Sequence, residues 1–255
     1  DEASGDEHEV KRTKSDTTSQ NIQIARETAE LFKSNIFKLQ IDELLAQVKL
    51  NDKHILKMEK VLHKFYDMVQ QIPEWKDKSV SDVESFFDNK IVAVPFADPK
   101  PSLANTNYKF GYLKPGVDLI GSFALKMGIY QPQGSNVDIL LTMPKELFDK
   151  KDFLNFRCLH KRSVYLAYFT HHFSILLKKN KLDHFMSVKY SYLNNDPLLP
   201  ILTVTCSKNP EHSSDEYNFH KTKFSIKFII GFPDGLFDPK KLLPNKNCIR
   251  LAGTQ

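Results

Sequence analysis

The segment VDLIGSFALKMGIYQPQGSNVDILLT, residues 117–142, decides the fold class of this sequence. Its first apolar run, 117–120, predicts a strand that ends at the pair Gly121-Ser122 and continues into a short helix-like segment. A loop at 131–135 contains a proline and a glycine, and residues 136–142 then predict a second strand with one embedded acid, Asp138. We therefore expect a strand-to-helix turn at Gly121-Ser122 and Asp138 on the neighbouring strand.

The residues after this segment predict one long helix and three more strands. Pro144 stops the strand at 136–142 and favours the first turn of a helix. Residues 153–181 form the strongest helical pattern, with an apolar face. Strands are predicted at 185–193, 201–206 and 224–230, with a polar loop at 207–219. The resulting fold class is α+β: a mixed sheet of about five strands, covered by helices.

The N-terminal part predicts mainly helices. Apolar residues repeat at helical spacing in 37–48 and again in 55–72, with a break where Asp52 can cap the second helix. We expect these helices to form an antiparallel hairpin packed on the main domain. A capping-box pattern at 81–84 predicts a short helix to Phe87, residues 90–94 predict a strand, and residues 98–107 predict a loop.

The predicted division of the chain has three parts. Residues 1–21 are polar and charged and predict a disordered tail. Residues 22–90 form the helical segment, and residues 91–250 form the main domain. The chain starts at Asp1 rather than Met and ends without an obvious terminal element, so we expect it to be a fragment of a longer protein.

Composition excludes several classes of protein. Hydrophobic residues make up 41% of the 255 residues, which excludes wholesale disorder. The sequence contains no apolar run long enough for a transmembrane helix, and its acidic start is unlike a signal peptide. Three widely spaced cysteines predict neither a disulfide framework nor a zinc site, and they favour a reducing compartment.

The net charge of +5 hides an asymmetry between the two parts of the chain. Residues 151–255 carry 16 basic and 8 acidic side chains, whereas residues 1–150 carry 20 and 23. A basic half indicates either a face for polyanions or an incidental excess of surface lysines, and charge alone leaves both open. The helix at 153–181 supplies the candidate contacts for RNA or an acidic partner: Arg157, Lys161, Arg162, Lys178, Lys179 and Lys181.

A Gly-Ser turn followed by an acid-bearing strand is typical of nucleotidyl transfer. Backbone N–H groups at such a turn cradle a triphosphate. Two carboxylates in an Asp-x-Asp pattern point to one face of the strand, because strand side chains repeat every two residues. Such carboxylates hold two magnesium ions about 3.5–4 Å apart, which bind the attacking and leaving oxygens.

The runs at 119–124 and 136–139 resemble the polymerase beta-like nucleotidyltransferase superfamily, which includes poly(A) polymerases and CCA-adding enzymes. The longer text from Asp118 to Tyr168 resembles the first domain of the Nrap family of nucleolar RNA-associated proteins. This resemblance extends from about residue 22 to residue 250. It implies a nucleotidyltransferase palm, a nucleolar location and a role in small-subunit rRNA processing. The implied partners are pre-rRNA or snoRNA and processome proteins, including the UTP-C subunits; no membrane or small-molecule substrate is expected.

The sequence departs from the enzyme pattern at the carboxylates. Asn136 stands at the first acid position, and Asp138 keeps the second. In the enzymes a third carboxylate, on a later strand, completes the site. Its position here falls on Lys227 or, with an alignment shifted by two, on Ser225. One carboxylate is a poor magnesium site, so we expect no catalytic residue, metal or cofactor at the degenerate site of Gly121, Ser122, Asn136, Asp138 and Lys227.

Three classes of function stay open from the sequence. The first is a non-catalytic scaffold in pre-ribosome assembly, which the resemblance implies and the missing carboxylates favour. The second is an active RNA nucleotidyltransferase, which needs a carboxylate from another segment. The third is a module that senses a nucleotide without turning it over. The Gly121-Ser122 turn either still binds phosphate or is a retained tight turn.

Overall fold

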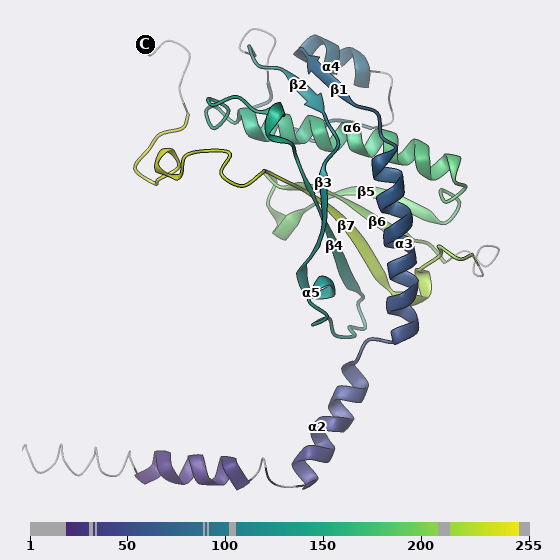
Figure 1. The fold of residues 1–255 in the computed structure, drawn as a ribbon, viewed down its shortest axis with the longest axis vertical. Helices are drawn as coiled ribbons and strands as arrows, with labels where there is room; N and C mark the ends of the chain where they lie inside the picture. The colour runs from purple at the N-terminus through teal and green to yellow at the C-terminus, as the bar shows by residue number, and fades with distance from the viewer. Residues whose placement is uncertain are drawn as a thin grey trace, which may run out of the picture. The chain divides into compact units, whose positions relative to one another are not determined.

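The computed structural model describes residues 19–30, 33, 35–88, 90, 92–101, 106–208 and 215–249 (Figure 1). It divides the chain into two compact units, Asp1–Lys49 and Leu50–Gln255. In the first unit, residues 19–30 are helical, and so is α2 (Asn35–Val48), in which no residue is buried. Residues 1–18 of the predicted tail lie outside the described residues, and residues 19–21 are helical rather than disordered.

The second unit contains a five-stranded mixed sheet with the order β3-β4-β7-β6-β5. Its strands are β3 (Gly116–Ile120), β4 (Ser135–Thr142), β7 (Phe224–Gly231), β6 (Pro200–Cys206) and β5 (Met186–Tyr192). Only the central pair β4–β7 is parallel, and the other neighbours are antiparallel. This confirms the predicted α+β class with a mixed sheet.

Two helices cover one face of this sheet, α3 (Asp52–Gln70) and α6 (Arg157–Lys179) (Figure 1). In β7 every second residue is buried, which is the alternation of a strand with one covered face. The ring of Phe65 on α3 lies 5.1 Å from that of Phe173 on α6 and 5.9 Å from that of Phe228 on β7. The core therefore lies between the helices and this face, and the other face carries the polar side chains.

A smaller layer packs against α6. It consists of β1 (Trp75–Lys78), which pairs antiparallel with β2 (Phe110–Tyr112), and α4 (Val80–Phe87). The Trp75 ring stacks on Tyr168 of α6 with centroids 4.9 Å apart. The remaining described elements are α5 (Gly121–Ala124) and the short 3-10 helices η1 (Lys145–Leu147), η2 (Leu193–Asn195), η4 (His220–Thr222) and η5 (Pro239–Lys241).

Several local predictions need correction. Residues 90 and 92–94 form no strand; Val92 and Val94 pack against the core without joining a ladder. The capping box is built by Ser79 and Asp82 rather than at 81–84, because Ser79 is the residue before the first helical turn. Asn51, not Asp52, caps α3, accepting a hydrogen bond from the backbone of Lys53.

The predicted boundary at residue 90 is not where the structure divides the chain. The helix α3 belongs to the same compact unit as the sheet, since Met58, Val61 and Phe65 are buried in its core. The packing of the 35–48 helix on the main domain stays a prediction. None of the described helices combines the length and apolar character needed to cross a membrane.

Candidate functional site

The turn predicted at Gly121-Ser122 lies where β3 passes into α5. Ile120 precedes the helix in extended conformation, and Gly121 has a φ of 75°, in the left-handed region that favours glycine. A Cβ atom on Gly121 would lie 3.0 Å from Oδ2 of Asp138. The turn and the retained acid are therefore in direct proximity, as the sequence predicts.

The register between β4 and β7 shows where Lys227 and Ser225, the two candidates for the third acid position, lie relative to Asn136 and Asp138. Asn136 pairs with Ser225, and Asp138 pairs with Lys227. These four side chains share the sheet face opposite the buried Val137 and Ile226. The hydroxyl of Ser225 donates to Oδ1 of Asn136 at 2.7 Å. The two alternative alignments thus describe neighbouring positions on one face, and neither brings a carboxylate to Asp138.

A cavity of about 260 Å³ opens beside the turn. Ser122, Asn136 and Asp138 all line it, together with apolar residues and with Gly128 and Gly134 of the connection between α5 and β4. Among the described residues that line it, Asp138 is the only ionisable side chain. The arrangement offers hydrogen-bonding groups and a single anion, but no cation to meet a phosphate.

Burial raises the pKa of Asp138, and the nearby positive charge of Lys227 lowers it in part. In the described structure the two side chains form no ion pair, although they are register partners. Asp118 on β3 lies on the same face of the sheet. Its register partner is Leu140, two residues along β4 from Asp138. Among the described residues, no three His, Cys, Asp or Glu side chains are grouped so that they could hold a metal ion.

Two of the basic residues predicted to contact RNA are buried instead. Lys161 and Arg162 each expose only 5% of their surface. Lys161 is ion-paired with Asp152 at 2.5 Å and donates to the carbonyl of Leu147 at 2.8 Å. Arg162 donates to the carbonyl of Leu198 and lies 5.3 Å over the Phe232 ring. The prediction that these two residues contact RNA is therefore wrong. Both side chains are buried and bind acceptors on Leu147, Asp152 and Leu198, outside the helix.

The other predicted contacts are accessible and lie at opposite ends of α6. Lys178, Lys179 and Lys181 are exposed at or just beyond its C-terminal end. Arg157 is the first residue of the helix and lies 5.3 Å over the Tyr108 ring. The structure does not bring these two groups together.

Arg157 instead joins lysines that the sequence did not single out. It lines a pocket with Lys150 and Lys151, which precede the helix, and with lysines of the 240–246 segment. Each basic stretch is short, and they are separated by more than 80 residues along the chain. The only available signal was the recurrence of Lys in the segment Pro239-Lys240-Lys241 and at Lys246.

Comparison with known proteins identifies the family. Residues 77–255 match the family model described as Nrap protein domain 1. The chain is 70% identical over 236 residues to U3 small nucleolar RNA-associated protein 22 of Saccharomyces cerevisiae, covering 92% of this chain and 19% of that protein. It is 34% identical over 248 residues to Nucleolar protein 6 of Xenopus laevis, covering 95% of this chain and 20% of that protein. The chain thus spans about a fifth of the length of these relatives.

A solved structure of Cid1 poly(U) polymerase with bound MgGTP also aligns with this chain. It covers 79% of this chain and 39% of that one, at 13% identity and a TM-score of 0.38. This likeness is too low to carry a functional conclusion. The family model spans most of the second unit, including the Gly121-Ser122 turn and Asp138. On the match at 77–255 and the identity with these relatives, the chain belongs to the Nrap protein family.

Proposed function

We propose that this chain is a non-catalytic, nucleotidyltransferase-like scaffold domain of a nucleolar factor that acts in small-subunit rRNA processing. The names of its relatives support the nucleolar and snoRNA-associated part of this proposal. The expected partners are pre-rRNA or snoRNA and other processome proteins, including the UTP-C subunits. The proposed location is the nucleolus.

One observation carries the non-catalytic part: Asp138 stands between Asn136 on its own strand and Lys227 on the next. Two-metal chemistry needs clustered anions that hold cations against a triphosphate. The amide of Asn136 contributes no charge, and the ammonium of Lys227 has the sign that repels a divalent cation. Loss of such electrostatic stabilisation costs about 10²–10³ in rate for a single group.

The test is incorporation of labelled nucleotide into RNA ends by the purified chain, and by the longer protein that carries it, with magnesium or manganese. We expect no incorporation above that of the Asp138→Ala variant. Turnover that disappears in Asp138→Ala would overturn the proposal. Asp118 would then be the first acid to replace, because it lies on the same face of the sheet.

A second candidate function is nucleotide sensing, and the cavity of about 260 Å³ beside the Gly121-Ser122 turn favours it. Thermal stabilisation by a nucleoside triphosphate with magnesium separates the possibilities. The scaffold shows no stabilisation, the sensor shows stabilisation without product, and the enzyme shows both. The single carboxylate and the absence of any cation in the described lining support the scaffold.

A further inference from the structure

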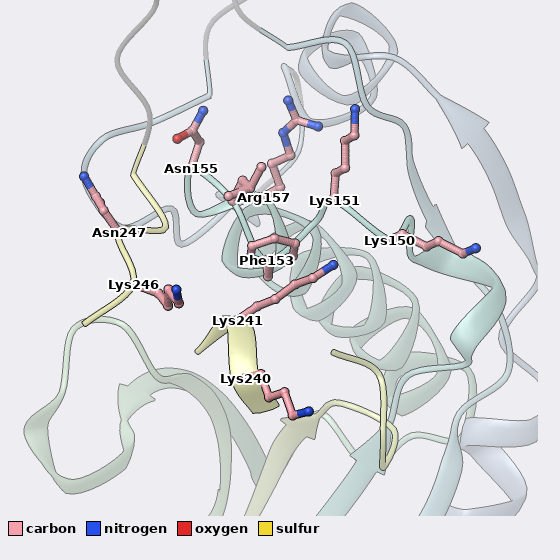
Figure 2. Close-up of a pocket in the computed structure, with 10 residues that line it drawn as sticks. Lys150, Lys151, Phe153, Asn155, Arg157, Lys240, Lys241, Lys246 and Asn247 are labelled. Carbon is pink, nitrogen blue, oxygen red and sulfur yellow. The ribbon is translucent and has the colours of Figure 1, made fainter. Parts of the chain in front are cut away.

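A second, larger pocket lies away from the Gly121-Ser122 turn, at the start of α6. Its volume is about 640 Å³. Figure 2 shows its two sides. One is the loop that carries Lys150 and Lys151, together with Arg157 at the start of α6; the other is the C-terminal segment that carries Lys240 and Lys241 on η5 and then Lys246. Segments more than 80 residues apart in the sequence thus form one pocket.

The lining of this pocket is strongly cationic. Of the described residues that line it, six are basic and none carries a carboxylate. Within the described part of the chain, none of these six is ion-paired. Five of them are exposed lysines, so their charges are available to a ligand. The six are Lys150, Lys151, Arg157, Lys240, Lys241 and Lys246. A concentration of like charge without internal compensation favours a polyanionic ligand.

The start of α6 adds to this positive potential. The helix has no acidic residue in its first turn, and Arg157 is its first residue. Cations at this end are disfavoured by the helix dipole, whereas an anion is stabilised there. Arg157 contacts the Tyr108 ring 5.3 Å away, but the helix dipole opposes its charge, and an external anion would offset that cost.

Specific contacts hold the two sides of the pocket together. The backbone N–H of Asn155 donates to the carbonyl of Cys248 at 2.9 Å. The thiol of Cys248 in turn contacts the carbonyl of Lys241 at 3.4 Å. On the other side, the buried pair Lys161–Asp152 anchors the loop between the pocket lysines and the helix. The segments that carry the pocket lysines are therefore joined to each other and to α6 by hydrogen bonds and an ion pair.

The other lining groups favour a nucleic acid over an acidic peptide. The half-buried ring of Phe153 lies 5.2 Å beneath the ammonium of Lys241 and offers a flat apolar surface (Figure 2). The amide oxygen of Asn247 accepts the backbone N–H of Ile249 at 2.8 Å, and its NH2 group is a donor for a sugar hydroxyl or a base edge. An aromatic ring beside a basic groove is typical of single-stranded RNA binding, where bases stack and phosphates meet lysines.

We propose that this pocket binds the phosphate backbone of a single-stranded RNA segment. The proposal deepens the scaffold function above and rests on it only in taking RNA as the partner. Of the helix residues predicted to contact RNA, this proposal keeps only Arg157. Lys161 and Arg162 are buried, and Lys178, Lys179 and Lys181 lie at the other end of α6, outside the pocket.

The test compares two charge-matched triple variants of the 255-residue chain. The pocket variant is Lys240→Glu/Lys241→Glu/Lys246→Glu. The control is Lys178→Glu/Lys179→Glu/Lys181→Glu, which changes the net charge equally at the other end of α6. Binding of a short fluorescein-labelled oligouridine is measured by anisotropy over a range of salt concentrations, with polyglutamate as the competing peptide. Circular dichroism and thermal unfolding check that both variants fold.

We expect the pocket variant to lose at least about tenfold in affinity and the control to stay within about twofold. The magnitude of the negative slope of log K against log salt should fall by about 2 in the pocket variant, because each lost phosphate contact on a single strand removes about 0.7 from it. Equal losses in both variants would assign binding to general surface charge and overturn the proposal. So would absence of RNA binding, or polyglutamate binding more tightly than RNA. None of these results decides whether the domain is non-catalytic, because the incorporation assay tests that part of the proposed function separately.

Discussion

The Nζ atom of Lys161 lies 2.5 Å from Oδ2 of Asp152, and both side chains are buried. The same carboxylate oxygen accepts the backbone N–H of Asp149 at 2.9 Å. The backbone carbonyl of Asp152 accepts the N–H of Cys158 at 3.0 Å. One ion pair thus fastens the loop before α6 to the helix itself, and this loop carries one side of the basic pocket.

Replacing Lys161 with Met should destabilise the fold strongly. Removal of one partner leaves the carboxylate of Asp152 buried without its counter-charge, which typically costs about 3–5 kcal/mol. Urea unfolding measures the change. Lys178→Met is the matched control, because Lys178 is exposed on the same helix, and surface changes usually stay within about 0.5 kcal/mol. Equal costs for the two variants would show that the Lys161–Asp152 pair contributes nothing to stability.

Replacing Gly121 with Ala should destabilise the second unit more than Gly235→Ala does. Both glycines have positive φ, 75° and 65°, so both variants carry the strain of a left-handed residue, about 1–2 kcal/mol. Only at Gly121 does the new methyl group also meet Oδ2 of Asp138, at 3.0 Å; at Gly235 nothing lies within 4 Å. Thermal unfolding of the two variants isolates this contact. If both variants lose the same free energy of unfolding, the contact between the new methyl group and Asp138 costs nothing, and the expectation is wrong.

The central strands of this fold follow from sequence alone because each is a continuous apolar or alternating run. The predicted strands at 136–142, 201–206 and 224–230 correspond closely to β4, β6 and β7. The pair β1–β2 was not predicted, because its strands have four and three residues and lie more than 30 residues apart. Their pairing depends on tertiary contacts, such as Trp75 against Tyr168, which leave no local pattern.

The candidate site was predictable in part for similar reasons. Gly121, Ser122 and Asp138 stand in one contiguous segment, so their proximity could be inferred from strand order. The burial of Lys161 could not be predicted, because its partner Asp152 lies outside residues 153–181, where the helical pattern was recognised. The spacing of residues in a helical sequence predicts which side chains share a face. It does not predict which hydrogen-bond acceptors from other segments contact that face.

The stability of the second unit should fall as pH decreases from 6.5 to about 4, partly through His172. Burial, then the charges of His171 and Lys90, lowers the pKa of His172 from 6.5 to about 4. Between these values the unfolded chain binds a proton that the folded chain does not, so acid favours unfolding. The ring lies 4.4 Å from that of Tyr168, which makes phenylalanine an acceptable replacement.

His172→Phe should therefore show a shallower loss of stability across this pH window than the unchanged chain. Urea unfolding at several pH values gives the slope, and an NMR titration of the imidazole gives the pKa directly. Protonation of His172 near 6.5 in the folded chain would contradict the expectation, as would identical slopes in the two proteins.

The scaffold proposal predicts that carboxylates restored at the matched positions create a metal site. In the variant Asn136→Asp/Lys227→Asp, both new acids flank Asp138, one on its own strand and one on the register partner of β7. Three clustered carboxylates supply the anionic anchors that magnesium and manganese need. Metal at ten times its Kd then adds about 1.4 kcal/mol of stability, because it binds only the folded state.

The matched control is Asn136→Asp/Lys189→Asp. It makes the same chemical changes, but Lys189 lies on β5, beyond Thr203 of β6 and two strands away from Lys227. The measurement is the shift in melting temperature on adding metal, so any cost of placing aspartate in a strand cancels within each variant. We expect a shift for Asn136→Asp/Lys227→Asp alone. A shift of equal size in the control, or in the unchanged chain, would show that metal binding does not depend on the positions occupied by Asn136 and Lys227. The main argument for proposing a non-catalytic domain would then fail.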